Sequence, residues 1–328
     1  MRAVWIEEFT GPEGLRLRED LDRPEPGPDE ILLRVRASGL NRADLLQSLG
    51  RYPAPEGVPD RIPGLECAGE VVAVGSGVRR WRPGDRVMAL LSGGGQAEYA
   101  RVQEALAWPV PEGMSWAEAA AIPEAFLTAW DALIRQAGLR PGESVLIHAV
   151  GSGLGLAALQ IAQLAGARAI YGTASAEKLS RARALGLTAG WDYRQEEFVR
   201  ALRDREPEGV SVVFDLVGGP YWKANLDVLE PLGRLLLLGT LGGTRLPEGA
   251  DLGPVLRKRL RILGSVLRTR PLWEKIALGE AFGREVWPLL ASGRLRPILD
   301  CAFPASEPQA AYRYMAENRN FGKIVLLW

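Results

Sequence analysis

Residues 144–167 read SVLIHAVGSGLGLAALQIAQLAGA, and this stretch decides the fold of the second half of the chain. An apolar run is followed by Gly151, Gly153 and Gly155, and then by a long apolar segment. Glycines between a buried strand and a helix allow a tight turn and let backbone N–H groups approach a pyrophosphate. The spacing departs from GxGxxG because Leu156 stands where the third glycine belongs. The strand, loop and helix together still predict a dinucleotide site.

The segments around this loop alternate between strand-like and helical patterns. Helices are expected from Leu154 to Ala165 and from Ala176 to Leu185. Near-continuous runs of Val, Leu and Ile separated by helices predict a parallel sheet covered on both faces. The sequence therefore predicts an α/β protein with a doubly wound Rossmann domain over residues 123–267. The strand-like runs are SVLIHAV, RAIYGTA, VSVVFDLVG, GRLLLLGT and RLRILGS.

The first third of the chain has a different pattern. Short extended runs separated by Gly and Pro predict an antiparallel, barrel-like domain. Ser115 and Glu118 have capping-box spacing, and an Ala-rich helix is expected from there through Ala137. Two later helices, at 272–292 and 307–317, and a closing strand GKIVLLW are expected to return to the first domain. At 328 residues two domains are the default, and we expect one catalytic domain from residues 1–122 and 268–328.

Composition narrows the class of partner. Forty basic residues balance forty acidic ones, which disfavours binding to nucleic acid or an anionic membrane surface and favours a small neutral substrate. Cys67 and Cys301 lie far apart and belong to no CxxC pair, so reduced thiols are expected. No run approaches the roughly 20 apolar residues of a membrane span. The opening MRAVWIEEF carries acids where a signal peptide needs an apolar run. These features predict a cytoplasmic protein.

The end of the second strand of the Rossmann pattern bears on which dinucleotide is bound. Enzymes that use NAD place an acid there, against the ribose 2′-OH. Here the strand ends RAIYGTAS without an acid, and Thr173, Ala174 and Ser175 offer hydroxyl and backbone donors. Lys178 follows in the first turn of the next helix, where a 2′-phosphate would meet a positive charge. Glu177 is an acid in the same turn and argues against a 2′-phosphate there. We interpret it as a solvated charge at a helix N-terminus. The sequence favours NADPH over NADH.

Residues 61–90, RIPGLECAGEVVAVGSGVRRWRPGDRVMAL, resemble the signature of the quinone oxidoreductases, also called zeta-crystallins, among the zinc-free medium-chain dehydrogenases and reductases. The resemblance continues through GLNRADLLQSLGRYP, AFLTAWDAL, IHAVGSGLG, FDLVGG and GKIVLL. Residues 257–271, RKRLRILGSVLRTRP, look most like the subgroup of the p53-inducible quinone reductase. The resemblance implies a GroES-like catalytic domain with a Rossmann domain inserted into it. It also implies NADPH in the cleft between them and a homodimer formed through edge strands of the Rossmann sheet.

The resemblance implies site residues as well. Near the nicotinamide it implies Asn41, Tyr52 and Thr128. The other expected cofactor contacts lie in the glycine loop, at the following strand end, on the far side of the nicotinamide and in the C-terminal motif. They are Gly151, Ser152, Gly153, Leu154, Thr173, Ala174, Ser175, Lys178, Tyr193, Gly239, Thr240, Leu241, Ser265, Val266, Leu267 and Asn320.

No metal is expected. Zinc alcohol dehydrogenases of the same superfamily read GHE where this chain has Leu65 between Gly64 and Glu66, and have Cys in place of Asn41. Catalytic zinc prefers imidazole and thiolate ligands, and Glu66 with Glu124 alone would make a poor zinc site. The single histidine, His148, is interpreted as a strand-end residue bonded to backbone rather than as a catalytic group.

A quinone accepts hydride readily, so positioning it against the nicotinamide can be sufficient for catalysis. Asn41 and Tyr52 are the candidates for hydrogen-bonding the acceptor oxygen as negative charge develops. Reduction of an activated C=C bond, as in enones, is the alternative enzyme activity. A third hypothesis, from another class, is a non-catalytic protein that binds NADPH as a sensor, has a structural role or binds RNA. The absence of a basic aromatic stripe disfavours RNA.

Overall fold

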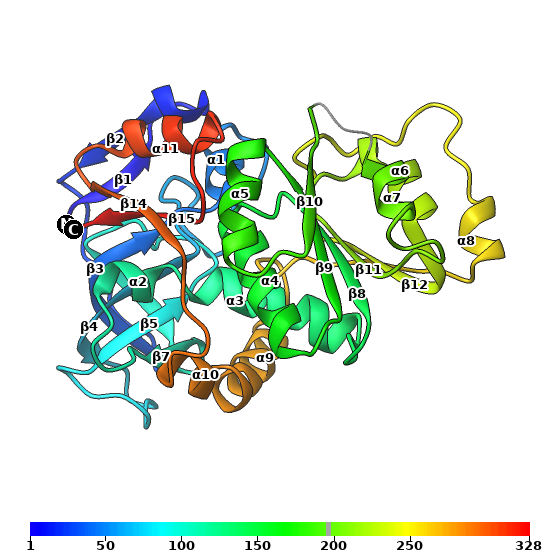
Figure 1. Ribbon diagram of the computed structural model, residues 1–328. Helices are drawn as coiled ribbons and strands as arrows, with labels where there is room; N and C mark the ends of the chain where they lie inside the picture. The colour runs from blue at the N-terminus through cyan, green and yellow to red at the C-terminus, as the bar shows by residue number, and fades with distance from the viewer. Residues whose placement is uncertain (195–197) are drawn as a thin grey trace. The chain divides into compact units, whose positions relative to one another are not determined.

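The computed structural model describes residues 1–194 and 198–328 of the chain (Figure 1). Two compact units are present, Met1–Leu127 with Leu267–Trp328, and Thr128–Val266. The functional division into 1–122 with 268–328, and 123–267, remains our proposal. None of the described helices is long and apolar enough to cross a membrane.

The unit Thr128–Val266 contains a six-stranded sheet, as the alternating pattern predicts. Every paired strand in it is parallel, in the order β10-β9-β8-β11-β12-β13. From β8 the chain first adds β9 and β10 on one side and then crosses to β11 on the other. The strands are β8 (Ser144–His148), β9 (Ala169–Ala174), β10 (Ala189–Asp192), β11 (Val210–Asp215), β12 (Leu229–Leu237) and β13 (Arg261–Gly264).

Helices cover this sheet on both faces, and its central strands β8 and β11 are mainly apolar. All residues of β8 and β11 are buried. Helices α4 and α5 lie along one face and α6 and α7 along the other (Figure 1). This arrangement confirms the doubly wound prediction. The helices are η3 (Asp131–Gln136, a π-helix), α4 (Gly153–Leu164), α5 (Ala176–Ala184), α6 (Phe198–Arg203), η4 (Gly219–Tyr221), α7 (Trp222–Val228) and α8 (Gly253–Arg257).

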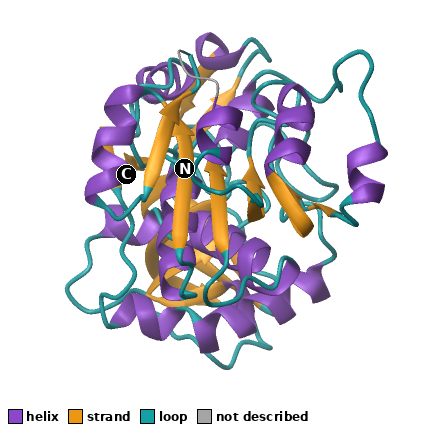
Figure 2. Cartoon of the chain, turned by 45° about the vertical axis from the view of Figure 1, so that its right-hand side comes forward, coloured by secondary structure: helices purple, strands orange, loops and turns teal. Residues whose placement is uncertain are grey.

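A long segment without helix or strand connects β12 to α8 (Figure 2). Every residue from Thr240 to Leu252 is exposed. Leu241, Leu246 and Leu252 are among these exposed residues. Since β13 is the last strand in the order, the sheet of this unit ends in an edge at β13.

The other unit contains a seven-stranded sheet in the order β14-β15-β3-β4-β5-β7, with β6 also paired to β3, and a separate pair β1-β2. The antiparallel prediction holds for all of these pairs except β14 with β15, which is parallel. The strands are β1 (Ala3–Ile6), β2 (Leu15–Arg18), β3 (Glu30–Gly39), β4 (Glu66–Val74), β5 (Arg86–Leu90), β6 (Tyr99–Gln103), β7 (Ala107–Pro109), β14 (Leu299–Pro304) and β15 (Lys323–Leu327).

The helices of this unit pack around the sheet. Trp108 of β7 packs edge-on against Phe282, with ring centroids 5.0 Å apart. Cys67 is fully buried in β4, as expected for a small core residue. The helices are η1 (Gly11–Gly14), α1 (Arg42–Ser48), η2 (Glu104–Leu106), α2 (Trp116–Ala120), α3 (Pro123–Trp130, which continues into the other unit), α9 (Leu272–Glu285), α10 (Trp287–Ala291) and α11 (Pro308–Ala316).

The single helix expected from Ser115 to Ala137 is wrong. The capping box is present, because Ser115 Oγ accepts from Glu118 N and Glu118 Oε2 accepts from Ser115 N. However, α2 ends at Ala120 and a new helix starts at Pro123, whose missing N–H cannot continue the hydrogen-bond ladder of α2. The first turn of α3 therefore has N–H groups without partners inside the helix, and one of them becomes important below.

Candidate functional site

The glycine loop lies between β8 and α4, where the strand order reverses. Ligands of doubly wound sheets bind at this switch point, outside the carboxyl ends of the strands. Ala149 has a positive φ of 51°, a conformation that costs a non-glycine residue energy and that clusters at functional sites. Ser152 begins α4 as its N-cap, and its Oγ accepts a hydrogen bond from Gly155 N at 3.0 Å. The hydroxyl proton of Ser152 remains available to donate to an anion.

Two glycines of the loop have distinct physical roles. A Cβ on Gly155 would lie 2.5 Å from Ala149 O, so this glycine allows the loop to close onto α4. A Cβ on Gly151 would instead lie 2.9 Å from Lys178 Cδ and 3.0 Å from Lys178 Cβ. Gly151 therefore leaves space for the aliphatic chain of Lys178. The fold brings the loop and the basic residue of α5 together, although 27 positions separate them in the sequence.

The ends of β9 and β10 lie beside this loop. Ala174 is buried, whereas Ser175 is the N-cap of α5 and makes no capping bond with its side chain. Asp192 Oδ2 instead accepts from Ala176 N at 3.2 Å, and its Oδ1 accepts from Arg194 N at 3.0 Å. Asp192 is therefore a buried acid already occupied by backbone donors. Asp192 was not among the expected site residues, because β10 is short and was not predicted.

Tyr193, expected at the adenosine end, is half exposed and adjoins this position. The guanidinium of Arg194 lies over its ring, 5.4 Å from the centroid. Arg194 is exposed and was missed by the sequence analysis. The backbone of Arg194 lies close to the start of α5, because Asp192 accepts from both Arg194 N and Ala176 N.

His148 has side-chain partners, so the predicted bond to backbone is wrong. It is fully buried, with Nδ1 2.8 Å from Thr173 Oγ1 and Nε2 2.8 Å from Asn225 Oδ1. Since an amide oxygen only accepts, Nε2 carries the proton and Nδ1 accepts from Thr173. Asn225 in turn donates to Asp215 Oδ2 at 2.9 Å. Burial lowers the pKa of His148 to about 4.

This pairing changes what Thr173 can offer. Its hydroxyl donates to His148 and its side chain is buried, so the hydroxyl proton is not available to a ligand. Thr173 O itself accepts from Val150 N at 3.1 Å, which fastens the glycine loop to β9. The role of Thr173 in the described structure is therefore to hold the glycine loop in place through its backbone oxygen.

The remaining expected contacts in this unit have varied surroundings. Thr128 Oγ1 is buried and has no hydrogen-bond partner among the described residues. Ser265 Oγ accepts from Gln136 Nε2 at 2.8 Å. Gly239 follows β12, and a Cβ on it would lie 3.0 Å from Leu216 O. The other positions are at least partly accessible: Gly153, Leu154, Thr240, Leu241 and Val266.

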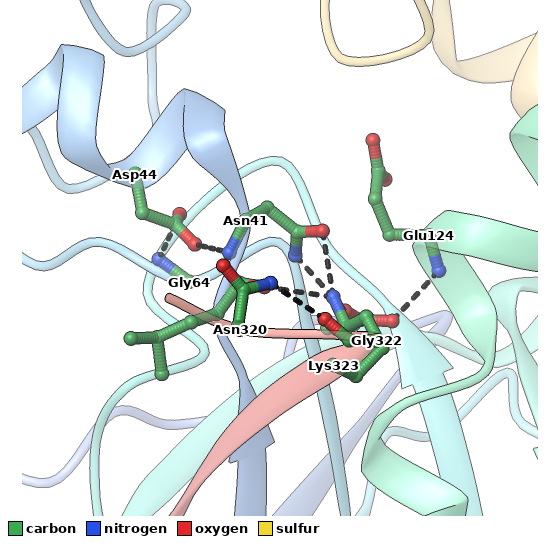
Figure 3. Close-up of polar contacts among 9 residues, drawn as sticks. Asn41, Asp44, Gly64, Glu124, Asn320, Gly322 and Lys323 are labelled. Carbon is green, nitrogen blue, oxygen red and sulfur yellow. Dashed lines mark hydrogen bonds and ion pairs between the residues drawn. The ribbon is translucent and has the colours of Figure 1, made fainter. Parts of the chain in front are cut away.

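In the first unit, Glu66 is the centre of a buried polar cluster that includes Asn41 and Lys323, both labelled in Figure 3. Its Oε1 accepts from Asn41 Nδ2 at 2.9 Å and also from Lys323 Nζ. Its Oε2 accepts from the backbone N of Glu124 at 2.9 Å, one of the unpaired first-turn groups of α3. A Cβ on Gly39 would collide with Glu66 Oε1, so the glycine makes room for the carboxylate.

Lys323 neutralises this carboxylate. From the start of β15 its Nζ donates to Leu40 O and to Asn41 Oδ1, both at 2.8 Å, as well as to Glu66. The ammonium thus has three acceptors and is almost fully buried. The sequence analysis did not assign a role to Lys323. The signal was a lysine opening the apolar run KIVLL, because a charged residue is rarely buried without a partner.

Asn41 is held in place from both ends. Its amide joins Glu66 and Lys323, and its backbone N donates to Asp44 Oδ2 at 2.8 Å. Asp44 is buried and also accepts from Gly64 N at 3.0 Å. Burial raises the pKa of Asp44 to about 6. One N–H of the Asn41 amide is left to donate to a ligand.

Glu124 differs from the other acids of the cluster. Its carboxyl group makes no hydrogen bond or ion pair with any part of the chain that the structure describes, and it keeps partial solvent access. Figure 3 shows its side chain extending away from Asn41 and Lys323. Burial and the nearby charge of Glu66 raise the pKa of Glu124 to about 8.

Tyr52 lies against a buried arginine. The Arg268 guanidinium is 5.0 Å from the Tyr52 ring centroid and donates to Tyr52 O at 3.2 Å. It also donates to Gln47 Oε1 at 2.7 Å and to Ser92 O at 2.6 Å. Lys275 donates to Ser92 Oγ at 2.6 Å. Arg268 therefore connects the loop that contains Tyr52 to α1 and to the segment after β5. No sequence motif indicated this role of Arg268.

Asn320 lies in the connection between α11 and β15. Its Nδ2 donates to Gly322 O at 2.7 Å, immediately before β15. Across residues 1–194 and 198–328 there is no group of three or more His, Cys, Asp or Glu side chains placed to hold a metal ion. At Glu66 the positive charge is supplied by Lys323.

The chain is similar to known proteins in both sequence and fold. Residues 27–112 match the family model of an alcohol dehydrogenase GroES-like domain, and residues 153–281 match that of a zinc-binding dehydrogenase. A quinone oxidoreductase of Pseudomonas aeruginosa is 36% identical, with 99% of each chain covered. A synaptic vesicle membrane protein VAT-1 homolog of Rattus norvegicus is 34% identical over all of this chain and 84% of its own length. The CurK enoyl reductase structure superposes with a TM-score of 0.88 at 32% identity, covering 99% of this chain and 98% of that one.

Proposed function

The chain belongs to the quinone oxidoreductase type of the medium-chain dehydrogenases and reductases, and from this membership we propose that it catalyses NADPH-dependent reduction of a quinone. The observation that carries the proposal is the contact between Gly151 and Lys178 at the switch point of the sheet. At this point the glycine loop can approach a pyrophosphate. Lys178 lies beside the loop and can meet a further phosphate.

The residues present fit the cofactor. When bound, the nicotinamide supplies a hydride. The Ser152 hydroxyl and the N-terminus of α4 would hold the pyrophosphate, because helix N-termini favour negative charge. The buried Thr128 hydroxyl, which lacks a partner in the described chain, is a further donor or acceptor for the bound molecule. An unsatisfied buried hydroxyl is costly, so a ligand that bonds it removes that cost.

Preference for NADPH over NADH rests on charge. The 2′-OH of NAD needs an accessible acid at the end of β9, and that strand ends in Thr173, Ala174 and Ser175. Asp192 lies nearby but already accepts two backbone N–H groups. Ser175, Lys178 and Arg194 would supply a hydroxyl and two cations to a 2′-phosphate.

At the acceptor end, the Asn41 amide and the Tyr52 hydroxyl would bond the substrate oxygen. Asn41 is oriented by Glu66 and Lys323, and Tyr52 by Arg268. Donors fixed before the reaction stabilise charge that develops on the oxygen without reorganising. Their proposed role is electrostatic.

Reduction of an activated C=C bond is the second candidate. The fold similarity to the CurK enoyl reductase favours it. Both reactions deliver hydride to a conjugated carbonyl system, so the same donors would serve either one. The shape of the loops around the acceptor would decide between them.

The test is a steady-state comparison of NADPH and NADH oxidation with 1,2-quinones, 1,4-quinones and small enones. The proposal expects turnover with NADPH and quinones, and a higher kcat/KM for NADPH than for NADH. Enone turnover exceeding quinone turnover would favour the second candidate. Cofactor binding without oxidation by any acceptor would overturn both and favour a non-catalytic NADPH-binding role.

The proposal includes a homodimer in the cytoplasm, as the family resemblance implies. The terminal strand β13 and the exposed Leu241, Leu246 and Leu252 support an interface between copies at this edge. Light scattering should give twice the mass of 35.7 kDa. A monomeric mass at micromolar concentration would refute the dimer.

A further inference from the structure

The cluster around Glu66 contains two carboxyl groups with opposite surroundings. Glu66 has three donors, the Asn41 amide, the Lys323 ammonium and the backbone N–H of Glu124. Donors of this kind hold a carboxylate in its ionised form. The carboxyl group of Glu124 has no such partner within the described structure. Pairs of acids whose surroundings differ in this way divide into one charged and one neutral member.

We propose that Glu124 is the general acid that protonates the reduced acceptor, an inference that rests on the proposed function. The Glu66 carboxylate bridges Asn41 Nδ2 and the backbone N of Glu124, each at 2.9 Å. It thereby fixes the first turn of α3 next to the amide that would bind the acceptor oxygen. The Glu124 side chain is directed away from Asn41 and Lys323 and keeps solvent access (Figure 3).

The proton transfer from Glu124 follows hydride transfer to the acceptor. An acceptor that has gained a hydride has two more electrons and one more hydrogen, and its oxygen carries a negative charge. The O–H bond of the Glu124 carboxyl group breaks, and its proton forms a new O–H bond on that oxygen. Glu124 is left as a carboxylate, which takes a proton from water before the next cycle.

The charges around Glu124 set the pH range in which it can act. Asp44 and Glu66 favour its neutral form, whereas Lys323 and Arg268 favour the ionised form. Lys275 and Tyr52 also face it electrostatically. Burial lowers the pKa of Lys275 and the charge of Glu124 opposes that shift, whereas burial raises the pKa of Tyr52 and the charge of Glu124 adds to it. Burial and the acids prevail, and the pKa of about 8 leaves the proton on Glu124 at neutral pH.

Glu124→Gln tests the proposal, because glutamine keeps the shape and the backbone bond to Glu66 but cannot give up a proton. We expect turnover with a quinone at pH 7 to fall about 100-fold, the usual range for a lost acid catalyst. Wild-type turnover should decline as pH rises through about 8, and the variant should lack this decline. Glu124→Asp should restore part of the rate. Glu112→Gln, which changes an exposed acid in a turn, is the matched control.

Infrared difference spectra supply a readout that needs no turnover. Wild-type protein without cofactor should show the carbonyl band of a protonated carboxyl group that disappears as pH rises through about 8. Glu124→Gln should lack this band, and Glu112→Gln should retain it. Wild-type turnover that Glu124→Gln leaves unchanged, or a missing band, would overturn the role of Glu124 alone. Inactivity of the wild type with every acceptor would instead overturn the proposed function.

Discussion

Lys323 at the start of β15 and Glu66 at the start of β4 form an ion pair from which water is almost excluded, with side-chain exposures of 5% and 0%. The two residues are 257 positions apart. Their pairing connects the last strand of the chain to the centre of the first unit's sheet. Buried charges are tolerated only when they are paired and hydrogen-bonded, and this pair meets both conditions.

Lys323→Met should destabilise the protein strongly. The substitution leaves the Glu66 carboxylate buried without its ammonium partner, and breaking a buried pair on one side costs about 3–5 kcal/mol. Urea unfolding followed by circular dichroism would measure the loss. Lys223→Met, at an exposed position of α7, is the control and should change stability by less than about 0.5 kcal/mol. Adding Glu66→Gln to Lys323→Met should recover part of the loss, and no recovery would argue against charge as the cause.

His148 should make stability depend on pH between about 4 and 6.5. Its folded pKa is lowered to about 4, so the unfolded chain binds the proton first as pH falls. The stability that neutral His148 contributes is complete above pH 6.5 and is lost as pH falls toward 4, on the order of 3 kcal/mol in all.

Two measurements check this pH dependence. His148 is the only histidine, so its imidazole proton signals in NMR spectra are assigned without ambiguity. They should not shift until pH falls below about 5. In unfolding experiments, stability should fall less steeply over this range for His148→Gln than for wild type. An imidazole that titrates near 6.5 in the folded protein would contradict the prediction.

Lys178→Met should weaken NADPH binding about tenfold and leave NADH binding unchanged. Methionine preserves the aliphatic chain that lies against Gly151 but removes the charge proposed to meet the 2′-phosphate. One lost charge-assisted hydrogen bond accounts for an effect of this size. Fluorescence titration of each dinucleotide measures it, with Lys178→Arg as the charge-preserving control. Equal weakening for both dinucleotides would place Lys178 elsewhere on the cofactor.

Arg268→Lys should reduce kcat/KM for the acceptor about tenfold while NADPH affinity stays the same. Lysine keeps a charge but cannot donate simultaneously to Gln47, Tyr52 and Ser92 as the guanidinium does. The loop of Tyr52 then loses its fixed position, and misplacement of a substrate-binding group lowers the rate. Steady-state kinetics with a quinone would show it. The control is Arg284→Lys at an exposed position of α9, and a similar drop in that variant would refute a specific role for Arg268.

The second unit was predictable in most of its elements because its signals are local. An apolar run, a glycine turn and a helix follow one another within residues 144–167, and β8 and α4 form at nearly the expected bounds. The short strand β10 was missed, since its four residues include Gly190 and Asp192 and lack a strand-like composition. Gly190 is required there because a Cβ would lie 2.5 Å from Leu179 Cδ2, a contact that appears only when α5 packs on the sheet.

The fold class and the glycine loop could be predicted from the residues alone, because periodicity and turn chemistry act between neighbouring residues. Sequence motifs also indicated Asn41, Lys178 and Glu66. Three relationships follow from the assembled fold instead: Lys323 neutralises Glu66, Arg268 holds Tyr52, and the Glu124 carboxyl group has no partner among the described residues. The physical reason is that the charge state of a group depends on burial and on partners far along the chain, and both exist only after the strands have assembled.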